Sequence, residues 1–103
     1  MNLSKYLPLT ETTFYILVAL LEPGHGYHIM QKVEELSDGK VRVAAGTMYG
    51  ATDNLLKQKL IQSVPSEDKR RKTYVITDLG REVLHMEADR IRFLAKIAEK
   101  NNL

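Results

Sequence analysis

The chain has 103 residues, a formal net charge of +2 at pH 7 and no cysteine. This length predicts a single domain, and the missing cysteines exclude disulfides and thiolate metal sites, which is typical of a cytoplasmic protein. The longest apolar run, residues 14–21, is far shorter than the about 20 residues that a membrane-spanning helix needs. The first residues also lack the long apolar core of a signal peptide. We therefore expect a cytoplasmic protein with no membrane partner.

The first long helix is expected to end at about Glu22, after a short arm formed by residues 1–9. Thr10 is a suitable N-cap, and the sequence Pro23–Gly24 stops the helix. Residues 14–21 are apolar on every side, a pattern typical of a helix that is buried on more than one face. In a domain of this size, one of those faces is a candidate contact with a second subunit.

A second helix is expected from Tyr27 to about Ser37, following a turn at Gly24–Tyr27 and ending before Gly39. The alternation of polar and apolar residues at Lys40–Val43 then predicts a short strand. The apolar side chains that give the helix a core face recur at helical spacing and are Ile29, Met30, Val33 and Leu36.

The stretch Ala44–Leu60 reads as one helix with two different faces. Its apolar residues Met48, Ala51 and Leu55 share one side, because they are spaced at i, i+3 and i+7. The opposite side is slim and polar near the helix start, as a helix that enters the major groove of DNA requires. An ordinary solvent-exposed face would look similar. The candidate DNA-binding residues of this helix are Thr47, Tyr49, Gly50 and Lys57.

Two strands, Ile61–Val64 and Lys72–Ile76, are expected to form a hairpin after this helix. Four adjacent cations, Lys69, Arg70, Arg71 and Lys72, lie at its tip and at the start of its return strand. A helix-turn-helix followed by such a hairpin indicates a winged helix, in which the wing contacts phosphates or the minor groove. The alternative is a charged turn that only keeps the protein soluble.

The last helix is expected to start after an N-cap at Thr77 and to reach about Lys100. It carries two apolar stripes about 140° apart, which is more than a small head can cover. The first stripe consists of Leu79, Val83, Met86, Arg90, Phe93 and Ile97, and the second of Leu84, Ala88, Ile91, Ala95 and Ala98. One stripe would cover its own head and the other would close a homodimer, although the sequence does not say which. The alternative is a core helix of a single chain with one exposed face. The candidate dimerisation residues are Val83, Met86, Ile91, Leu94, Ile97 and Ala98.

With these pieces in order, the chain resembles the PadR family of winged-helix transcriptional regulators. The resemblance is carried by several short pieces in order, which are residues 9–17, His25–Tyr27 with Ile29, Gly46–Ala51, Leu60–Ile61, Arg70–Lys72 with Tyr74, and Thr77–Gly80. It looks most like the compact branch of that family, which has a single C-terminal helix. The resemblance implies a homodimeric DNA-binding repressor that a small-molecule effector releases. The chain departs from the family pattern at Thr52, where an apolar residue is usual, at Lys59, where a glycine often ends the helix, and in having no tryptophan.

No enzymatic motif is present. His25 and His28 are three residues apart, but this spacing alone is no metal-binding motif, so they are expected to form part of a turn and no metal or other cofactor is predicted. Three tyrosines, Tyr6, Tyr15 and Tyr27, could line an effector cavity or simply pack in the core.

These features predict an α+β winged helix-turn-helix with a C-terminal dimerisation helix. Residues 1–76 would form the DNA-binding domain and residues 77–103 the dimerisation helix. The partners expected are double-stranded DNA, a second copy of the chain and possible small-molecule effectors. The rival hypothesis is a winged-helix module that binds another protein and never contacts DNA.

Overall fold

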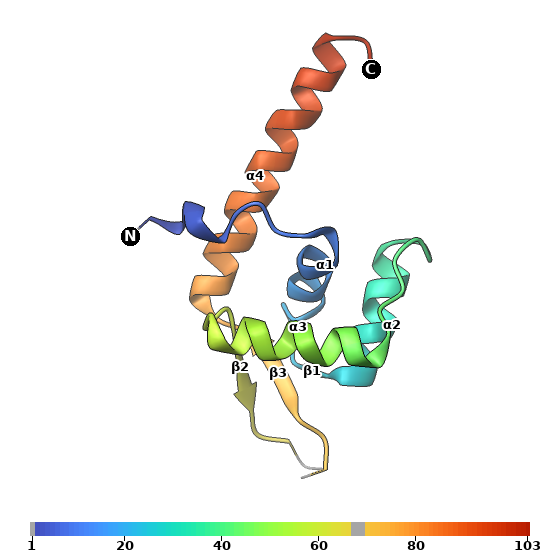
Figure 1. Cartoon of the computed structure of the whole chain (residues 1–103), viewed down its shortest axis with the longest axis vertical. Helices are drawn as coiled ribbons and strands as arrows, with labels where there is room; N and C mark the ends of the chain where they lie inside the picture. Colours follow the sequence, from blue (N-terminus) through green and yellow to red (C-terminus); the bar gives the residue numbers. More distant parts are fainter. Residues whose placement is uncertain (1, 67–69) are drawn as a thin grey trace.

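A small head made of helices and a three-stranded antiparallel sheet carries one long helix that leaves it (Figure 1). The computed structural model describes residues 2–66 and 70–103, and all structural statements refer to these residues. The elements in order are the 3₁₀ turn η1 (Leu3–Tyr6), α1 (Glu11–Ala19), β1 (Gly24–His25), α2 (Gly26–Leu36), α3 (Ala45–Lys57), β2 (Ile61–Val64), β3 (Thr73–Ile76) and α4 (Asp78–Lys100).

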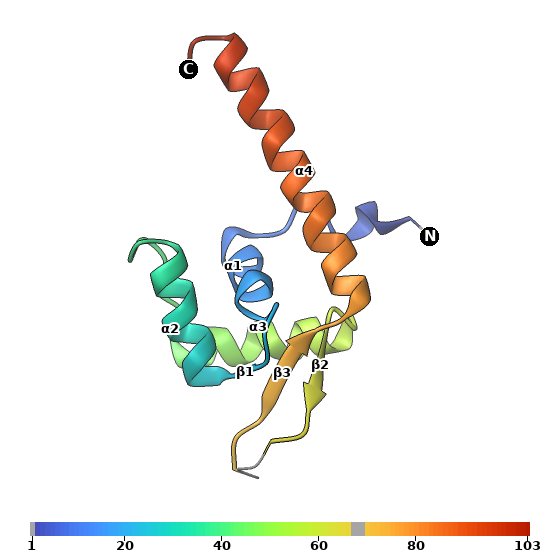
Figure 2. The same ribbon diagram turned by 180° about the vertical axis from the view of Figure 1, so that it is seen from behind.

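The α+β fold and the winged helix-turn-helix order predicted from the sequence are confirmed. In the described residues, α2 and α3 form the helix pair, and β2 and β3 form the hairpin with Ile61 opposite Ile76. No helix of these residues has both the length and the apolar character required to cross a membrane. Figure 2 shows that α3 crosses behind the sheet, while α4 starts where β3 ends and runs away from the head.

Two side-chain caps set the starts of α1 and α4 as predicted. The Thr10 hydroxyl accepts a hydrogen bond from the Thr13 amide at 3.1 Å, and the Thr77 hydroxyl accepts one from the Gly80 amide at 3.0 Å. Each cap satisfies an amide that has no partner within its own helix. The helix α1 ends at Ala19, three residues before the expected end at Glu22, since the chain must turn there to reach β1.

Two predictions about the short segments are wrong. Gly24–His25 is a strand rather than only a turn, because its backbone pairs with Tyr74 and Thr73 of β3. A strand of two residues has no periodicity that a sequence could reveal. Conversely, Lys40–Val43 is not a strand. The Val41 amide donates to the Ser37 hydroxyl at 2.9 Å, so this segment folds back on the end of α2 and finds no strand partner.

The end of α3 is closed by a residue in the left-handed region. Lys59 has φ 62°, and its amide donates to the Leu56 carbonyl while the Leu60 amide reaches back to Leu55, both at 3.0 Å. This pair of bonds is a Schellman motif, which favours glycine at the position that Lys59 occupies. The departure from the family pattern at Lys59 therefore leaves a left-handed residue that carries a Cβ.

We expect Lys59→Gly to raise the free energy of unfolding by about 1 kcal/mol, because glycine adopts a left-handed backbone without steric cost. Urea denaturation measures the change. The matched control is Lys32→Gly in the middle of α2, which should lower stability by about 1 kcal/mol through lost helix propensity. Equal effects of the two glycines would contradict this account of the α3 terminus.

The helix α4 joins the core only along its first half. Val83 and Leu84 are buried against the head, whereas Ile91 and Leu94 are 42% and 49% exposed. Each of the two apolar stripes thus begins inside the head and continues into solvent, instead of one stripe covering the head and the other staying free. Val83 is 0% exposed, so its place in the predicted dimer surface is wrong: its side chain is part of the core of its own chain.

A buried carboxylate ties the N-terminal arm to α4, and the sequence patterns did not single it out. Glu87 is 1% exposed. Its carboxylate accepts a hydrogen bond from the Leu9 amide at 2.6 Å and another from the Arg90 guanidinium. The hydrogen bond with Glu87 also raises the pKa of Arg90 above its ordinary value, so this guanidinium keeps its charge. With these partners Glu87 satisfies the rule that a buried charge must be paired.

Candidate nucleic-acid interface

The helix α3 presents its polar side to solvent and its apolar side to the core. Met48 and Leu55 are 1% and 2% exposed, while Tyr49 is 59% exposed. Thr47, Gly50 and Lys57 are also exposed, as the spacing predicted. The outward position of Tyr49 follows from its place next to Met48, since neighbouring helical residues point about 100° apart.

Thr52 replaces an apolar family residue without leaving an unsatisfied group. Its side chain is 1% exposed, and its hydroxyl donates to the Tyr49 carbonyl at 3.0 Å. A hydroxyl that bonds back to its own helix can be buried at little cost. The inward face of α3 therefore stays packed at Thr52, one turn after the exposed Tyr49.

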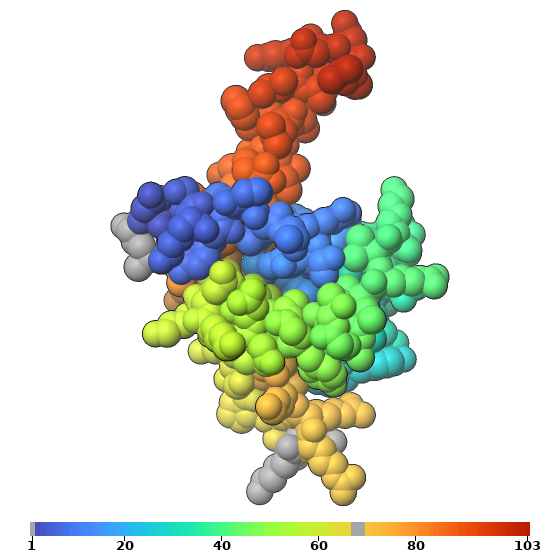
Figure 3. All heavy atoms as spheres, viewed as in Figure 1, coloured from blue at the N-terminus to red at the C-terminus, as the bar shows by residue number. Residues whose placement is uncertain are grey.

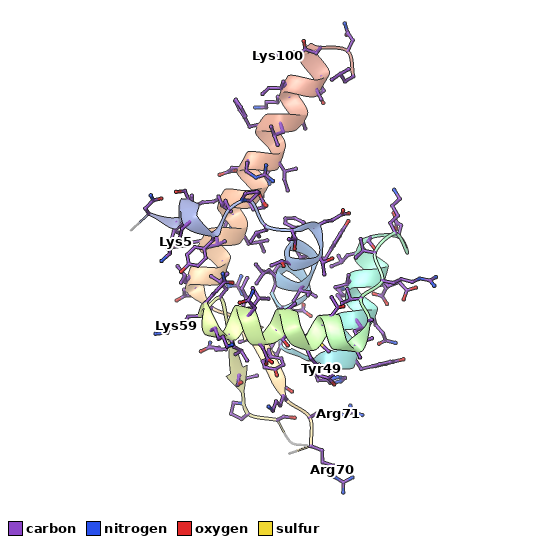
Figure 4. All side chains as sticks on the ribbon, in the orientation of Figure 1. Lys5, Tyr49, Lys59, Arg70, Arg71 and Lys100 are labelled. Carbon is purple, nitrogen blue, oxygen red and sulfur yellow. The ribbon has the colours of Figure 1, made fainter. Side chains whose placement is uncertain are left out.

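The exposed start of α3 and the cationic hairpin share one groove. Its volume is about 590 Å³, and it brings Tyr49 together with Arg70, Arg71 and Lys72. Figure 4 shows Tyr49 on α3 above Arg70 and Arg71 on the hairpin, and Figure 3 shows α3 crossing this face directly above the hairpin. The remaining residues that line the groove are His25, Gly26, Tyr27, Asp53 and Tyr74.

Not every predicted site residue lies in this groove. Thr47 and Gly50 are exposed on α3 but do not line it, and Lys57 lines a different groove at the far end of the helix. Lys69, the fourth predicted cation, lies outside the described residues. The three tyrosines considered for an effector cavity also separate, because Tyr6, Tyr15 and Tyr27 line three different grooves.

Tyr74 and Asp53 add polar groups to the cationic groove. Burial raises the pKa of the Tyr74 phenol, and the nearby Asp53 and Tyr49 raise it further. Tyr74 therefore stays protonated at neutral pH and can donate a hydrogen bond. The Asp53 carboxylate repels phosphates but can accept a hydrogen bond from an amino group such as N4 of cytosine. The groove thus combines cations suited to phosphates with groups suited to base edges.

His25 is held in place by contacts within the fold. Its Nδ1 accepts from the His28 amide at 3.4 Å as the N-cap of α2, and its Nε2 lies 3.3 Å from a guanidinium nitrogen of Arg71. Among the described residues, no three histidines, aspartates or glutamates gather as metal ligands would. The sequence singled out His25, Gly26 and Tyr27 as a motif, but only the pairing of β1 with β3 places them beside the hairpin cations.

A helix pair whose second helix is exposed beside a basic hairpin defines the winged helix-turn-helix class of DNA-binding domains. Comparison with protein families assigns the chain within that class. The model of the transcriptional regulator PadR-like family matches residues 16–86. The chain therefore belongs to the PadR-like family of transcriptional regulators, and the family resemblance of the sequence is confirmed.

Solved structures of similar chains agree with this assignment. A transcriptional regulator from Clostridium thermocellum is 27% identical, with a TM-score of 0.76 over 86% of this chain and 87% of the other. A PadR family regulator from Clostridium difficile is also 27% identical, with a TM-score of 0.72 over 88% and 98% of the two chains. One from Eggerthella lenta is 28% identical, with a TM-score of 0.71 over 85% and 78%. A search of curated protein sequences finds no match.

Proposed function

We propose that this regulator is a homodimeric repressor that binds a two-fold symmetric operator in the cytoplasm and has no enzymatic role. The observation that carries the proposal is the groove in which the exposed Tyr49 of α3 faces the cations of the hairpin. A slim polar helix start suits the major groove, and guanidinium groups beside it suit the phosphates that border that groove.

The residues divide into two roles. Thr47, Tyr49 and Gly50 would contact base edges, because they lie at the exposed start of α3. The cations would contact phosphates or the minor groove, which gives affinity but little sequence preference. These cations are Lys57 at the end of α3 and Lys69, Arg70, Arg71 and Lys72 of the wing, where Lys69 is included from the sequence alone.

The exposed half of α4 supports the dimer. Apolar side chains there remain in solvent in the single chain, and a second copy would remove them from water. Phe93, at 64% exposed, and Ile97, at 43%, belong to this surface. With Val83 in the core, the dimerisation residues that we propose are Met86, Ile91, Leu94, Ile97 and Ala98. In this division of the chain, residues 1–76 bind DNA and residues 77–103 hold the dimer together.

An effector would act where the arm meets α4. A groove of about 290 Å³ there is lined by Phe14, Tyr15 and Ile91 and by the ion pair of Glu87 and Arg90. A small molecule that occupied it would touch both α1 and the exposed part of α4. Because α4 would set the distance between the two reading helices, such a ligand would alter the fit to the operator.

Removing two wing cations tests the proposal. The first step is to select fragments bound by the protein from its host genome and to read whether a two-fold symmetric site emerges. On that site, Arg70→Ala with Arg71→Ala should weaken all DNA binding. The slope of log binding constant against log salt concentration should become less negative by about 0.9 for each phosphate that a subunit no longer neutralises. An unchanged slope would mean that the hairpin charges are only solvated. Absence of salt-dependent DNA binding in the parent would favour the protein-binding module instead.

The reading helix makes a different prediction. Tyr49→Ala and Thr47→Ala should keep the fold, because both side chains are exposed, yet each should cost about 1–3 kcal/mol of preference for the operator over random DNA. Competition binding with operator and scrambled duplexes measures that preference. If both variants discriminate as the parent does, the bases are read by another element.

A further inference from the structure

A second group of cations lies at the opposite end of α3 from the wing groove. Lys5, Lys57 and Lys59 line one groove of about 450 Å³ together with Tyr6 and Gln58. No acidic residue lines it, and none of these lysines forms an ion pair in the part of the chain that the structure describes. Figure 4 shows Lys5 and Lys59 on the same edge of the molecule, beyond the end of α3.

This groove adjoins the face of α3 that would read DNA. Lys57 follows Gly50 by seven residues, so both point to the same side of the helix. The helix has 13 residues and is therefore about 20 Å long, whereas the major groove of B-DNA is about 12 Å wide. If α3 crosses the groove with its first turn on the bases, its last turn reaches the edge of the groove, where phosphates lie.

The backbone holds Lys5 and Lys59 in place before any ligand binds. The Lys59 carbonyl accepts from the Thr77 hydroxyl at 2.7 Å, in addition to the Schellman bonds at its amide. Lys5 belongs to η1, which is anchored by the buried Leu3, and its ammonium lies 5.1 Å from the centre of the Tyr6 ring. Because the backbone at both positions is already ordered, binding a phosphate costs entropy only in the side chains.

We propose that Lys5, Lys57 and Lys59 form a second phosphate-binding site, which contacts the DNA backbone flanking each half-site. The inference rests on the proposed function and extends it, because it assigns a DNA-binding role to the N-terminal arm. The wing holds the duplex at one end of α3 and the lysine groove holds it at the other. Contacts of this kind lengthen the protected segment of DNA and strengthen the salt dependence without adding sequence preference.

The test compares two pairs of substitutions on two lengths of operator. Lys5→Gln with Lys59→Gln removes charges from the groove, and the control pair, Lys96→Gln with Lys100→Gln, removes the same charge from the exposed end of α4. We expect the groove pair to bind at least tenfold more weakly, with a salt slope flatter by about 0.9 for each phosphate that a subunit no longer neutralises. Hydroxyl-radical footprints should shorten at both flanks. On a fragment trimmed to the two half-sites, the groove pair and the control pair should bind equally.

Three further results distinguish the ways in which the inference could fail. Lys59→Gly should bind more weakly than the parent even though it folds more stably, so a loss of affinity cannot be ascribed to unfolding. If the groove pair keeps the slope and footprint of the parent on the long operator, the inference is overturned while the wing and reading helix stand. If the parent itself shows no salt-dependent binding to DNA, the proposed function fails and this inference fails with it.

Discussion

Ile91→Asp combined with Leu94→Asp should convert the protein into a monomer that has lost operator affinity by about two to four orders of magnitude. Both side chains are roughly half exposed in the single chain, so they can accept charge without breaking the core of the head. In a dimer they would face the partner, and burying four carboxylates there would be unfavourable. The loss is large because two linked heads bind an operator far more tightly than one head does.

The geometry of the operator explains why one head is not enough. A symmetric dimer can place its two reading helices about one DNA turn apart, near 34 Å, so that both meet the same side of the duplex. Sedimentation and operator binding should be measured on the same sample. The control is Arg92→Asp with Lys96→Asp, which adds the same number of carboxylates on the polar side of α4, away from the proposed dimer surface. A double variant that stays dimeric, or a monomer that binds as the parent does, would show that α4 does not carry the assembly.

Gly80→Ala should lower the free energy of unfolding by about 3 kcal/mol, the upper end of the usual cost of overpacking a core. A Cβ at Gly80 would lie 2.1 Å from the Leu60 carbonyl oxygen and 2.7 Å from Cγ1 of Ile76. The Leu60 carbonyl also accepts from the Thr77 amide at 3.0 Å, so it cannot move without disturbing the start of α4. Only glycine lets the first turn of α4 approach the end of α3 this closely.

Thermal and urea denaturation at one fixed protein concentration measure this loss, since dimerisation would make stability depend on concentration. Gly50→Ala is the matched control. A Cβ at Gly50 would meet no atom within 4 Å, and alanine in the middle of α3 should stabilise the helix by about 0.5–1 kcal/mol. Destabilisation of both variants to the same degree would mean that close packing at Gly80 is not the cause.

Local patterns were sufficient for most of the secondary structure. The caps at Thr10 and Thr77 lie where a hydroxyl precedes an apolar helical stretch, and each satisfies an amide of its own helix. The hairpin strands and the inward positions of Met48 and Leu55 also follow from periodicity. Such features depend on residues near one another in the chain, which is the information that a sequence displays directly.

Features built from distant residues could not be predicted in this way. β1 exists because Gly24 meets Tyr74, and Glu87 is buried because its carboxylate meets the Leu9 amide, 78 positions away in the sequence. The alternation at Lys40–Val43 was misleading, since a strand also needs a partner edge. Val83 illustrates the same limit on α4, where helical spacing identified an apolar residue but not the surface that covers it.

By itself, the sequence determined the order of the helices and of the two hairpin strands, the polar start of α3 and the run of cations from Lys69 to Lys72. Each of these is a property of a short stretch and does not depend on contacts with the rest of the chain. The tertiary structure alone decided that Tyr49 shares a groove with Arg71, and that Lys5 lies beside Lys59 at the other end of α3. Those neighbours come from separate elements, and only the packing of the head brings their charges close enough to act on one ligand.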